Sequence, residues 1–347
     1  MKVVFRVDAS VQMGSGHLMR CLTLAEAMRE RGVEVRFICR DHVGNLNAWL
    51  QSKGFVVTVL PQAVEGDPPA DDVSQRDAEQ TILALGKNMP DWLVVDHYGF
   101  DVNWELRLKP FVGRLMVIDD HTGRSHDCDV LLDQNYSEDG LQRYTGLIPP
   151  ECKTLIGPDY ALLRKEFSEL RGQIRRRSSL DNILVFFTAG DDQGETLKAM
   201  RGVALFGKAK QVDVVVGSSN PHNATIKKKC DELHWTYHCQ VDYMPSLIAN
   251  ADLVVGAGGS SNWERCALGV PALVTILADN QAAIAQALDG TEVVRNLGWF
   301  HQLEPIDYAD ALCALDGKRL AYMSDKAMRI VDAAGAKRVV DALFMNN

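Results

Sequence analysis

The sequence predicts an α/β protein made of two doubly wound, Rossmann-like domains with parallel sheets, and three observations support that prediction. Short runs rich in Val, Ile and Leu alternate with amphipathic helical stretches, a pattern typical of parallel sheets covered by helices on both faces. The alternation stops after about residue 150 and resumes near residue 181. The length of 347 residues suits two domains of ordinary size.

The first domain is assigned to residues 1–150. Its helices are illustrated by residues 17–31, where Leu18, Leu22, Ala25 and Met28 are spaced to form one buried face. Gly32 ends that helix. The predicted strands are residues 2–9, 34–40, 55–60, 92–98, 114–120 and 129–135.

A linker is expected over residues 151–180, which contain the basic run RGQIRRRSS. The second domain is assigned to residues 181–347. A final helical segment, residues 324–344, is long enough to pack back on the first domain. The predicted strands are residues 182–191, 211–219, 236–242, 252–261 and 271–277.

Composition and charge argue against a nucleic-acid partner, a membrane span and a signal peptide. A net charge of −9 argues against a nucleic-acid partner. No run of eighteen apolar residues is present, and Arg6 and Asp8 interrupt the first apolar run, so neither a membrane span nor a signal peptide is expected. The eight cysteines contain no CxxC pair and are interpreted as reduced thiols of a cytoplasmic protein. We expect a monomer.

The first candidate site follows the first predicted strand, where Gly14, Ser15 and Gly16 precede His17 at the start of a helix. Backbone amides at a helix N-terminus can bind an anion, and the helix dipole disfavours a charged imidazole. A neutral His17 could then act as a general base that activates water. Alternatively, His17 caps the helix and the glycines only turn the chain. Asp8, at the end of the strand, is expected to orient His17 or to hold the loop backbone.

The second candidate site is the segment GAGGSSNWE, which links a buried strand to a helix. Amides of Gly258 and Gly259 and hydroxyls of Ser260 and Ser261 can surround a diphosphate. Glu264 lies one turn into the helix, where its two oxygens can accept both hydroxyls of a ribose. The alternative is a glycine-rich turn followed by an ordinary surface glutamate.

Two further loops contain candidate binding residues. Gly190 ends a predicted strand, where a close approach of backbone to ligand or a plain turn explains the glycine. Asn280 and Gln281 begin a helix, a position at which Asn often serves only as a cap. The acidic pairs 119–120 and 191–192 could hold Mg²⁺ but are more typical of turns, so neither a metal nor another cofactor is expected.

Several of these motifs together resemble a known family. The stretch FRVDASVQMGSGHLMRCLTLA is similar to the pattern Arg-x-Asp-x-Ser-x-x-(Ile/Met)-Gly-x-Gly-His-x-x-Arg of the UDP-sugar hydrolases of pseudaminic acid biosynthesis. VVDHYGFD, IDD, GAGGSSNWERCALGVPAL and the pair Asn280-Gln281 also resemble that family. Its members are UDP-2,4-diacetamido-2,4,6-trideoxy-β-L-altropyranose hydrolases of the two-domain GT-B fold, related to the N-acetylglucosaminyltransferase that completes lipid II.

The resemblance implies a mechanism and a set of site residues. His17 would activate water to attack the anomeric carbon, so that UDP leaves by C1–O cleavage with inversion. Two alternatives stay open, a GT-B glycosyltransferase with a UDP-N-acetylhexosamine donor and a non-catalytic UDP-sugar-binding module; a related UDP-diacetamido sugar is a further possible substrate. The substrate-binding set is Gly14, Ser15, Gly16, Tyr98, Asn280 and Gln281, and the UDP-binding set is Gly190, Gly258, Gly259, Ser260, Ser261 and Glu264, in a cleft between the domains.

Overall fold

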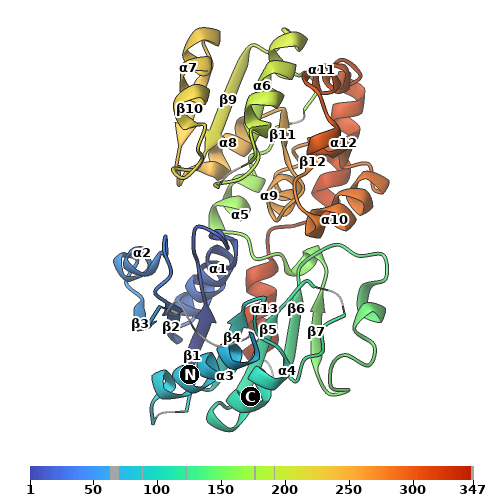
Figure 1. The fold of residues 1–347 in the computed structure, drawn as a ribbon. Helices are drawn as coiled ribbons and strands as arrows, with labels where there is room; N and C mark the ends of the chain where they lie inside the picture. Colours follow the sequence, from blue (N-terminus) through green and yellow to red (C-terminus); the bar gives the residue numbers. More distant parts are fainter. Residues whose placement is uncertain (63–69, 88, 122, 176, 191, 345–347) are drawn as a thin grey trace. The chain divides into compact units, whose positions relative to one another are not determined.

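The structure is a computed structural model that describes residues 1–344 except 63–69, 88, 122, 176 and 191. The chain divides into two compact units (Figure 1). The first unit comprises residues 1–135 and 139–162 and the segment from Gly335 onward; the second comprises residues 136–138 and 163–334. Each unit contains one sheet in which every pair of neighbouring strands is parallel, so the predicted fold class is confirmed.

The sheet of the first unit has seven strands in the order β3-β2-β1-β4-β5-β6-β7. The seventh strand pairs with β6 and lies within residues 151–180, so part of the expected linker belongs to this sheet. The sequence pattern misses it because only one of its four residues is fully buried. The strands are β1 (Lys2–Val7), β2 (Glu34–Arg40), β3 (Val56–Leu60), β4 (Trp92–Asp96), β5 (Arg114–Ile118), β6 (Val130–Asp133) and β7 (Lys153–Ile156).

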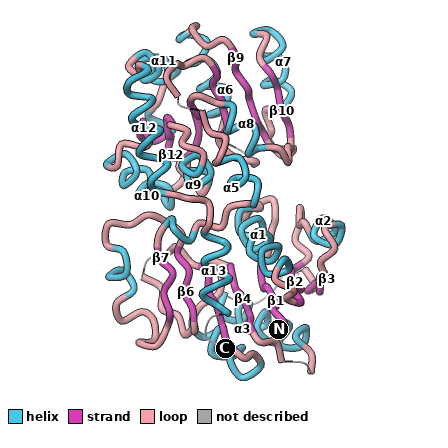
Figure 2. The backbone as a smooth tube through the Cα atoms, turned by 180° about the vertical axis from the view of Figure 1, so that it is seen from behind, coloured by secondary structure: helices cyan, strands magenta, loops and turns pink. Residues whose placement is uncertain are grey.

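Helices cover both faces of this sheet. Successive strand residues point to opposite faces, so Val3 and Phe5 pack with α1 (Gly16–Glu30) and α13 (Gly335–Phe344), whereas Val4 packs with α3 (Ala70–Leu85) and α4 (Val102–Leu108). Figure 2 shows α1 and α13 on the same side of the strands. The remaining helical elements are α2 (Asn47–Ser52) and the 3-10 turns η1 (Lys109–Phe111), η2 (Gly140–Tyr144) and η3 (Pro158–Tyr160).

The predicted C-terminal helix is two helices that belong to different units. The chain leaves helical geometry after Ile330, and Ala333 adopts a left-handed φ of 63° before α13 begins at Gly335. A Cβ at Gly335 would lie 2.2 Å from the carbonyl oxygen of Ala161, so only glycine allows this close approach. The apolar side of α13 completes the core of the first unit with Val339, Val340 and Leu343.

The sheet of the second unit has six strands in the order β10-β9-β8-β11-β12-β13. The edge strand β13, VRNLGW, was not predicted, since it is mostly half-exposed and lacks a continuous apolar run. The strands are β8 (Asn182–Phe186), β9 (Gln211–Val216), β10 (Thr236–Cys239), β11 (Leu253–Ala257), β12 (Ala272–Ile276) and β13 (Val294–Trp299). The helices are α5 (Lys165–Arg171), α6 (Glu195–Phe206), α7 (Asn223–Leu233), α8 (Met244–Asn250), α9 (Ser261–Ala267), α10 (Asp279–Gly290), α11 (Pro305–Cys313) and α12 (Gly317–Ile330), with the 3-10 turn η4 (Phe300–Gln302).

The parallel arrangement gathers the candidate residues of each unit at one edge of its sheet. In the first unit the loops after β1, β4 and β5 leave the same edge, because these strands are neighbours. In the second unit the loops after β8, β11 and β12 do likewise. The carboxyl-terminal edge of such a sheet is where ligands of doubly wound proteins bind.

Candidate active site

His17 lies against a buried carboxylate in the first unit. It is the second residue of α1, and its Nδ1 is 2.6 Å from Oδ1 of Asp96, the last residue of β4. Asp96 is fully buried, whereas the His17 side chain is 11% exposed. Burial alone would raise the pKa of Asp96, but Arg20 and His17 hold it well below its usual value. An ionised carboxylate only accepts hydrogen bonds, so Nδ1 of a neutral His17 donates and Nε2 keeps its lone pair.

Arg20 fixes the same carboxylate from one turn further along α1. Its Nε donates to Oδ2 of Asp96 at 2.5 Å and its Nη2 to Oδ1 at 2.7 Å. Residues three apart share a face of a helix, so His17 and Arg20 reach Asp96 together. The contact is bidentate, which restricts the carboxylate to one orientation. Arg20 therefore fixes the orientation of the Asp96 carboxylate that contacts the imidazole.

Tyr98 lies beside the imidazole, and its place in a sugar pocket stays a prediction. Its ring contacts that of His17 edge-on, with centroids 4.4 Å apart, and contacts His121 in the same way at 4.2 Å. Its hydroxyl donates to Oδ1 of Asp120 at 2.7 Å. Burial and Asp120 raise the pKa of Tyr98 well above its usual value, so the phenol keeps its proton. Asp120 also lies 3.5 Å from Arg20, which closes the network.

The prediction that Asp8 orients His17 is wrong. The Asp8 carboxylate accepts from Nη1 of Arg6 and from the backbone amide of Arg40, both at 2.6 Å. Its other oxygen lies 3.4 Å from Nε2 of His97. Asp8 belongs to a buried ion-pair network on β1 and its neighbour β2, whereas the last residue of β4 meets the histidine. The alternative role, holding backbone at this edge of the sheet, fits the bond to the Arg40 amide.

The loop before α1 forms a tight turn. The amide of Gly14 donates to the carbonyl oxygen of Ser10 at 2.9 Å, and the φ of Gly14 is +73°, which favours glycine. Since this amide is engaged in the turn, Gly14 is not placed to donate to a ligand. Gly16 begins the helix, and the Ser15 side chain makes no cap hydrogen bond. Ser15 and Gly16 stay predicted substrate-binding residues.

The loop between β11 and α9 in the second unit is supported from beneath. The buried Asn262 donates from Nδ2 to the carbonyl oxygen of Gly258 at 2.9 Å. Within the part of the chain that the structure describes, the amides of Gly259, Ser260 and Ser261 donate to no protein acceptor. Ser260 is exposed, and Gly259 and Ser261 are half-buried. This loop can therefore offer several donors to an anionic ligand.

Glu264 lies within the first turn of α9 and is half-buried. Burial raises the pKa of its carboxyl, while the nearby charges of Arg164 and Arg265 lower it. Among the described residues, no cation lies within ion-pair distance of this carboxylate. Both oxygens can therefore accept hydrogen bonds from a ligand, the role predicted for Glu264 toward a ribose.

The other predicted residues of the second unit lie around the same edge. Gln281 follows β12, and its Cβ would be 3.6 Å from a Cβ added at Gly258, which places it against the β11–α9 loop. Asn280 is the exposed second residue of α10, whose N-cap is Ala278, so Asn280 is not the cap. Gly190 follows β8, and its amide donates to the Thr188 hydroxyl at 3.3 Å.

The two acidic pairs considered as Mg²⁺ ligands are residues 191–192 and residues 119–120. Asp191 lies outside the described residues, and its neighbour Asp192 accepts from the amides of Gly194 and Thr196 at 3.0 Å. Asp119 and Asp120 are bonded to separate partners. Across the described residues, no three His, Cys, Asp or Glu side chains lie together in a way that could hold a metal ion.

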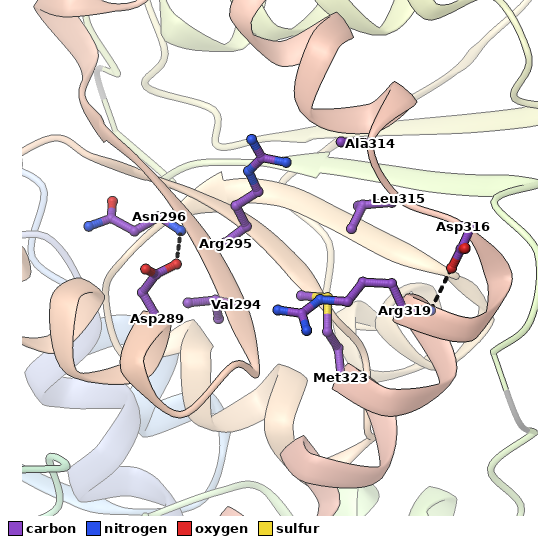
Figure 3. Close-up of a pocket in the computed structure, with 9 residues that line it drawn as sticks. All are labelled: Asp289, Val294, Arg295, Asn296, Ala314, Leu315, Asp316, Arg319 and Met323. Carbon is purple, nitrogen blue, oxygen red and sulfur yellow. Dashed lines mark hydrogen bonds between the residues drawn. The ribbon is translucent and has the colours of Figure 1, made fainter.

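A cavity of about 500 Å³ in the second unit lies away from all the predicted site residues (Figure 3). It is lined by Val294 and Arg295 at the beginning of β13, and therefore lies at the edge of the sheet opposite the β11–α9 loop. Both of its aspartates accept hydrogen bonds from the backbone. Asp289 accepts from the amide of Asn296, and Asp316 accepts from the amide of Arg319. The cavity is therefore no part of the predicted nucleotide site.

These features define the class of protein. Two parallel α/β units of this topology have the GT-B fold of glycosyltransferases, and the crystal structure of MurG from Acinetobacter baumannii matches with a TM-score of 0.71 over 99% of both chains at 14% identity. No family model matches the chain. Among the described residues, no helix is long and apolar enough to span a membrane.

Two proteins of known name are similar to this chain in sequence. The UDP-2,4-diacetamido-2,4,6-trideoxy-β-L-altropyranose hydrolase of Campylobacter jejuni is 28% identical over 229 residues, which are 66% of this chain and 74% of that protein. The spore coat polysaccharide biosynthesis protein SpsG of Bacillus subtilis is 22% identical over 303 residues, 86% of this chain and 84% of that protein. The resemblance that the motifs predicted is confirmed by the first of these similarities.

Proposed function

We propose that this protein is an enzyme that hydrolyses UDP-2,4-diacetamido-2,4,6-trideoxy-β-L-altropyranose, a step of pseudaminic acid biosynthesis. The observation that carries the proposal is the contact between His17 and Asp96, which leaves Nε2 of the imidazole able to accept a proton. The similarity to the Campylobacter hydrolase supports the substrate. Among the described residues, no second imidazole contacts Asp96.

The proposed reaction is a single displacement by water. Nε2 of His17 accepts a proton from water while the water oxygen forms a bond to the anomeric carbon. The bond between that carbon and the diphosphate oxygen breaks, and its electron pair leaves with UDP. Attack from the face opposite the leaving group inverts the configuration. Asp96 stabilises the imidazolium that forms, as the carboxylate does in other His-Asp pairs.

In this proposal the second unit binds the leaving group. The amides of Gly259, Ser260 and Ser261, which donate to no backbone acceptor among the described residues, and the hydroxyls of the two serines donate to the diphosphate, which stabilises its developing charge. The Glu264 carboxylate accepts the ribose hydroxyls. The first unit contributes Tyr98, whose ring lies against the base, as a wall of the sugar pocket.

Hydrolysis in H₂¹⁸O without any acceptor tests this function. We expect stoichiometric release of UDP, label only in the sugar, and a first product of opposite anomeric configuration. Label in UDP would mean attack on phosphorus and would overturn the proposal. Release of UDP that requires an added glycosyl acceptor would instead make the protein a transferase.

A pair of histidine variants tests the base. His17→Asn should keep the fold and lower kcat by roughly 10²–10⁴-fold, the usual contribution of general base catalysis. His121→Asn is the matched control, because His121 contacts the same Tyr98 ring but has no contact with Asp96. We expect the control to lose far less activity. Equal losses in the two variants would assign His17 only a packing role.

A further inference from the structure

Arg265 lies beneath the β11–α9 loop. It is the fifth residue of α9, is 1% exposed, and donates from Nη2 to the carbonyl oxygen of Ala257 at 3.1 Å and to Oδ1 of Asn262. Asn262 in turn holds the carbonyl of Gly258. A Cβ at Gly256 would lie 3.4 Å from Nη1 of Arg265 and 2.0 Å from the carbonyl oxygen of Phe186, so the guanidinium fits closely against the end of β11.

Among the described residues, Arg265 forms no ion pair, and the carboxylate of Glu264 acts on its charge only from a longer distance. Its Nε and Nη1 are buried and have no hydrogen-bond partner among the described residues. No carboxylate in the described part of the chain lies within 4.0 Å of the guanidinium. Burial lowers the pKa of Arg265 to about 10, so the side chain stays charged at neutral pH. A buried charge without a partner destabilises a fold unless another group supplies the counter-charge.

Two other fully buried arginines, Arg6 and Arg177, have hydrogen-bond acceptors for their guanidinium groups. Arg6 is paired with the carboxylates of Asp8 and Asp77. Arg177, in the same unit as Arg265, donates to backbone carbonyl oxygens, among them those of Ala249 and Leu268 at 3.0 and 2.9 Å. In the described part of the chain, Nε and Nη1 of Arg265 have no hydrogen-bond acceptor, and the same is true of the backbone amides of the neighbouring loop.

We infer that Arg265 is the buried cation that makes the β11–α9 loop select a phosphorylated nucleotide over the corresponding nucleoside. Its field adds to the partial charges of the Gly259, Ser260 and Ser261 amides, and an anionic ligand on the loop supplies the missing counter-charge. Arg265 is a supporting residue and does not touch the ligand. The inference rests on the proposed function, because that function places a UDP moiety on this loop.

Titration calorimetry of Arg265 variants tests the inference, with UDP and uridine as the two ligands. Arg265→Met should weaken UDP binding by about 10- to 100-fold, the effect expected of one unit charge acting through partly screened protein within about 10 Å. Uridine affinity should change by less than about threefold, and Arg265→Lys should retain most of the preference for UDP. Equal losses of UDP and uridine affinity, or no loss of either, would overturn the inference.

Arg177→Met is the matched control, since it removes a buried arginine of the same unit that does not contact the loop. It should change stability without changing the ratio of UDP to uridine affinity. If Arg265→Met does not fold, Arg265→Gln serves instead, because it removes the charge but keeps a polar side chain with an amide donor, and it should also lower the ratio. A parent protein that does not bind UDP at all would contradict the proposed function, whereas an unchanged ratio in the variants contradicts only the role of Arg265.

Discussion

Replacement of Asp96 by Asn is the sharpest test of the site in the first unit. The substitution keeps the shape of the side chain but removes the charge that holds the Nδ1 proton of His17. An asparagine can present its amide nitrogen to Nδ1, which favours the tautomer with the proton on Nε2, where it blocks the base. We expect kcat to fall by about 10²–10⁴-fold, which corresponds to about 3–5 kcal/mol at 1.36 kcal/mol per factor of ten.

The same substitution should also destabilise the first unit. Arg20, whose side chain is 10% exposed, loses a bidentate partner and, among the described carboxylates, keeps Asp120 at 3.5 Å. Removing one member of a buried pair costs about 3–5 kcal/mol, and the remaining partner and partial exposure place this case near the lower limit. Urea unfolding measures this loss, and UDP release at saturating substrate, under conditions where the variant is folded, measures kcat.

Asp8→Asn provides the matched control, because Asp8 is equally buried at the end of the neighbouring strand and is paired with Arg6. It should lose comparable stability but no more than about tenfold in kcat. If Asp96 acts through His17, the double variant His17→Asn/Asp96→Asn should be about as slow as His17→Asn alone. An Asp96→Asn enzyme with turnover within about threefold of the parent would refute the reasoning, as would additive losses in the double variant.

Three further predictions concern the ligand, the metal and pH. Glu264→Ala should weaken UDP binding by about 2–4 kcal/mol in a calorimetric titration, since the ribose hydroxyls would lose a charged acceptor. Because burial raises the pKa of Glu264, the UDP affinity of the parent should fall on acidification at a higher pH than it would for an ordinary glutamate. A UDP affinity that does not change with pH would contradict this. Turnover should persist in excess EDTA, and a loss that Mg²⁺ restores would contradict it. Burial lowers the pKa of His126, but Asp119 and Glu105 outweigh it and raise this pKa to about 9, so the stabilisation is complete below about pH 6.5 and is lost as pH rises through 9. Denaturant unfolding should show a loss of at most about 3 kcal/mol between these limits that His126→Gln removes, and a pH-independent parent would be the contrary result.

Local sequence was enough to predict most of the strands and the helix that begins beside His17. The strands β4 (WLVVD) and β11 (LVVGA) are buried and mostly apolar, the composition typical of central parallel strands. The elements that were missed are β7 and β13, whose residues are largely half-buried or exposed, so that pairing with a neighbour decides their conformation. The assignment of α13 to the first unit likewise depends on distant partners, since Val339 and Val340 pack into a core formed by side chains from residues 3–162.

The sequence by itself also placed His17 at the start of a helix after a glycine turn, and a strand before Tyr98, because these are local features of chain geometry. Which carboxylate meets the imidazole was decided by tertiary structure. Asp8 and Asp96 both lie at the ends of strands. Their difference arises from the order β2-β1-β4 and from the arginine that each carboxylate binds, which is Arg6 for Asp8 and Arg20 for Asp96. The sequence likewise does not show that Nε and Nη1 of Arg265 are buried without a hydrogen-bond partner among the described residues, because folding creates the surroundings of a side chain.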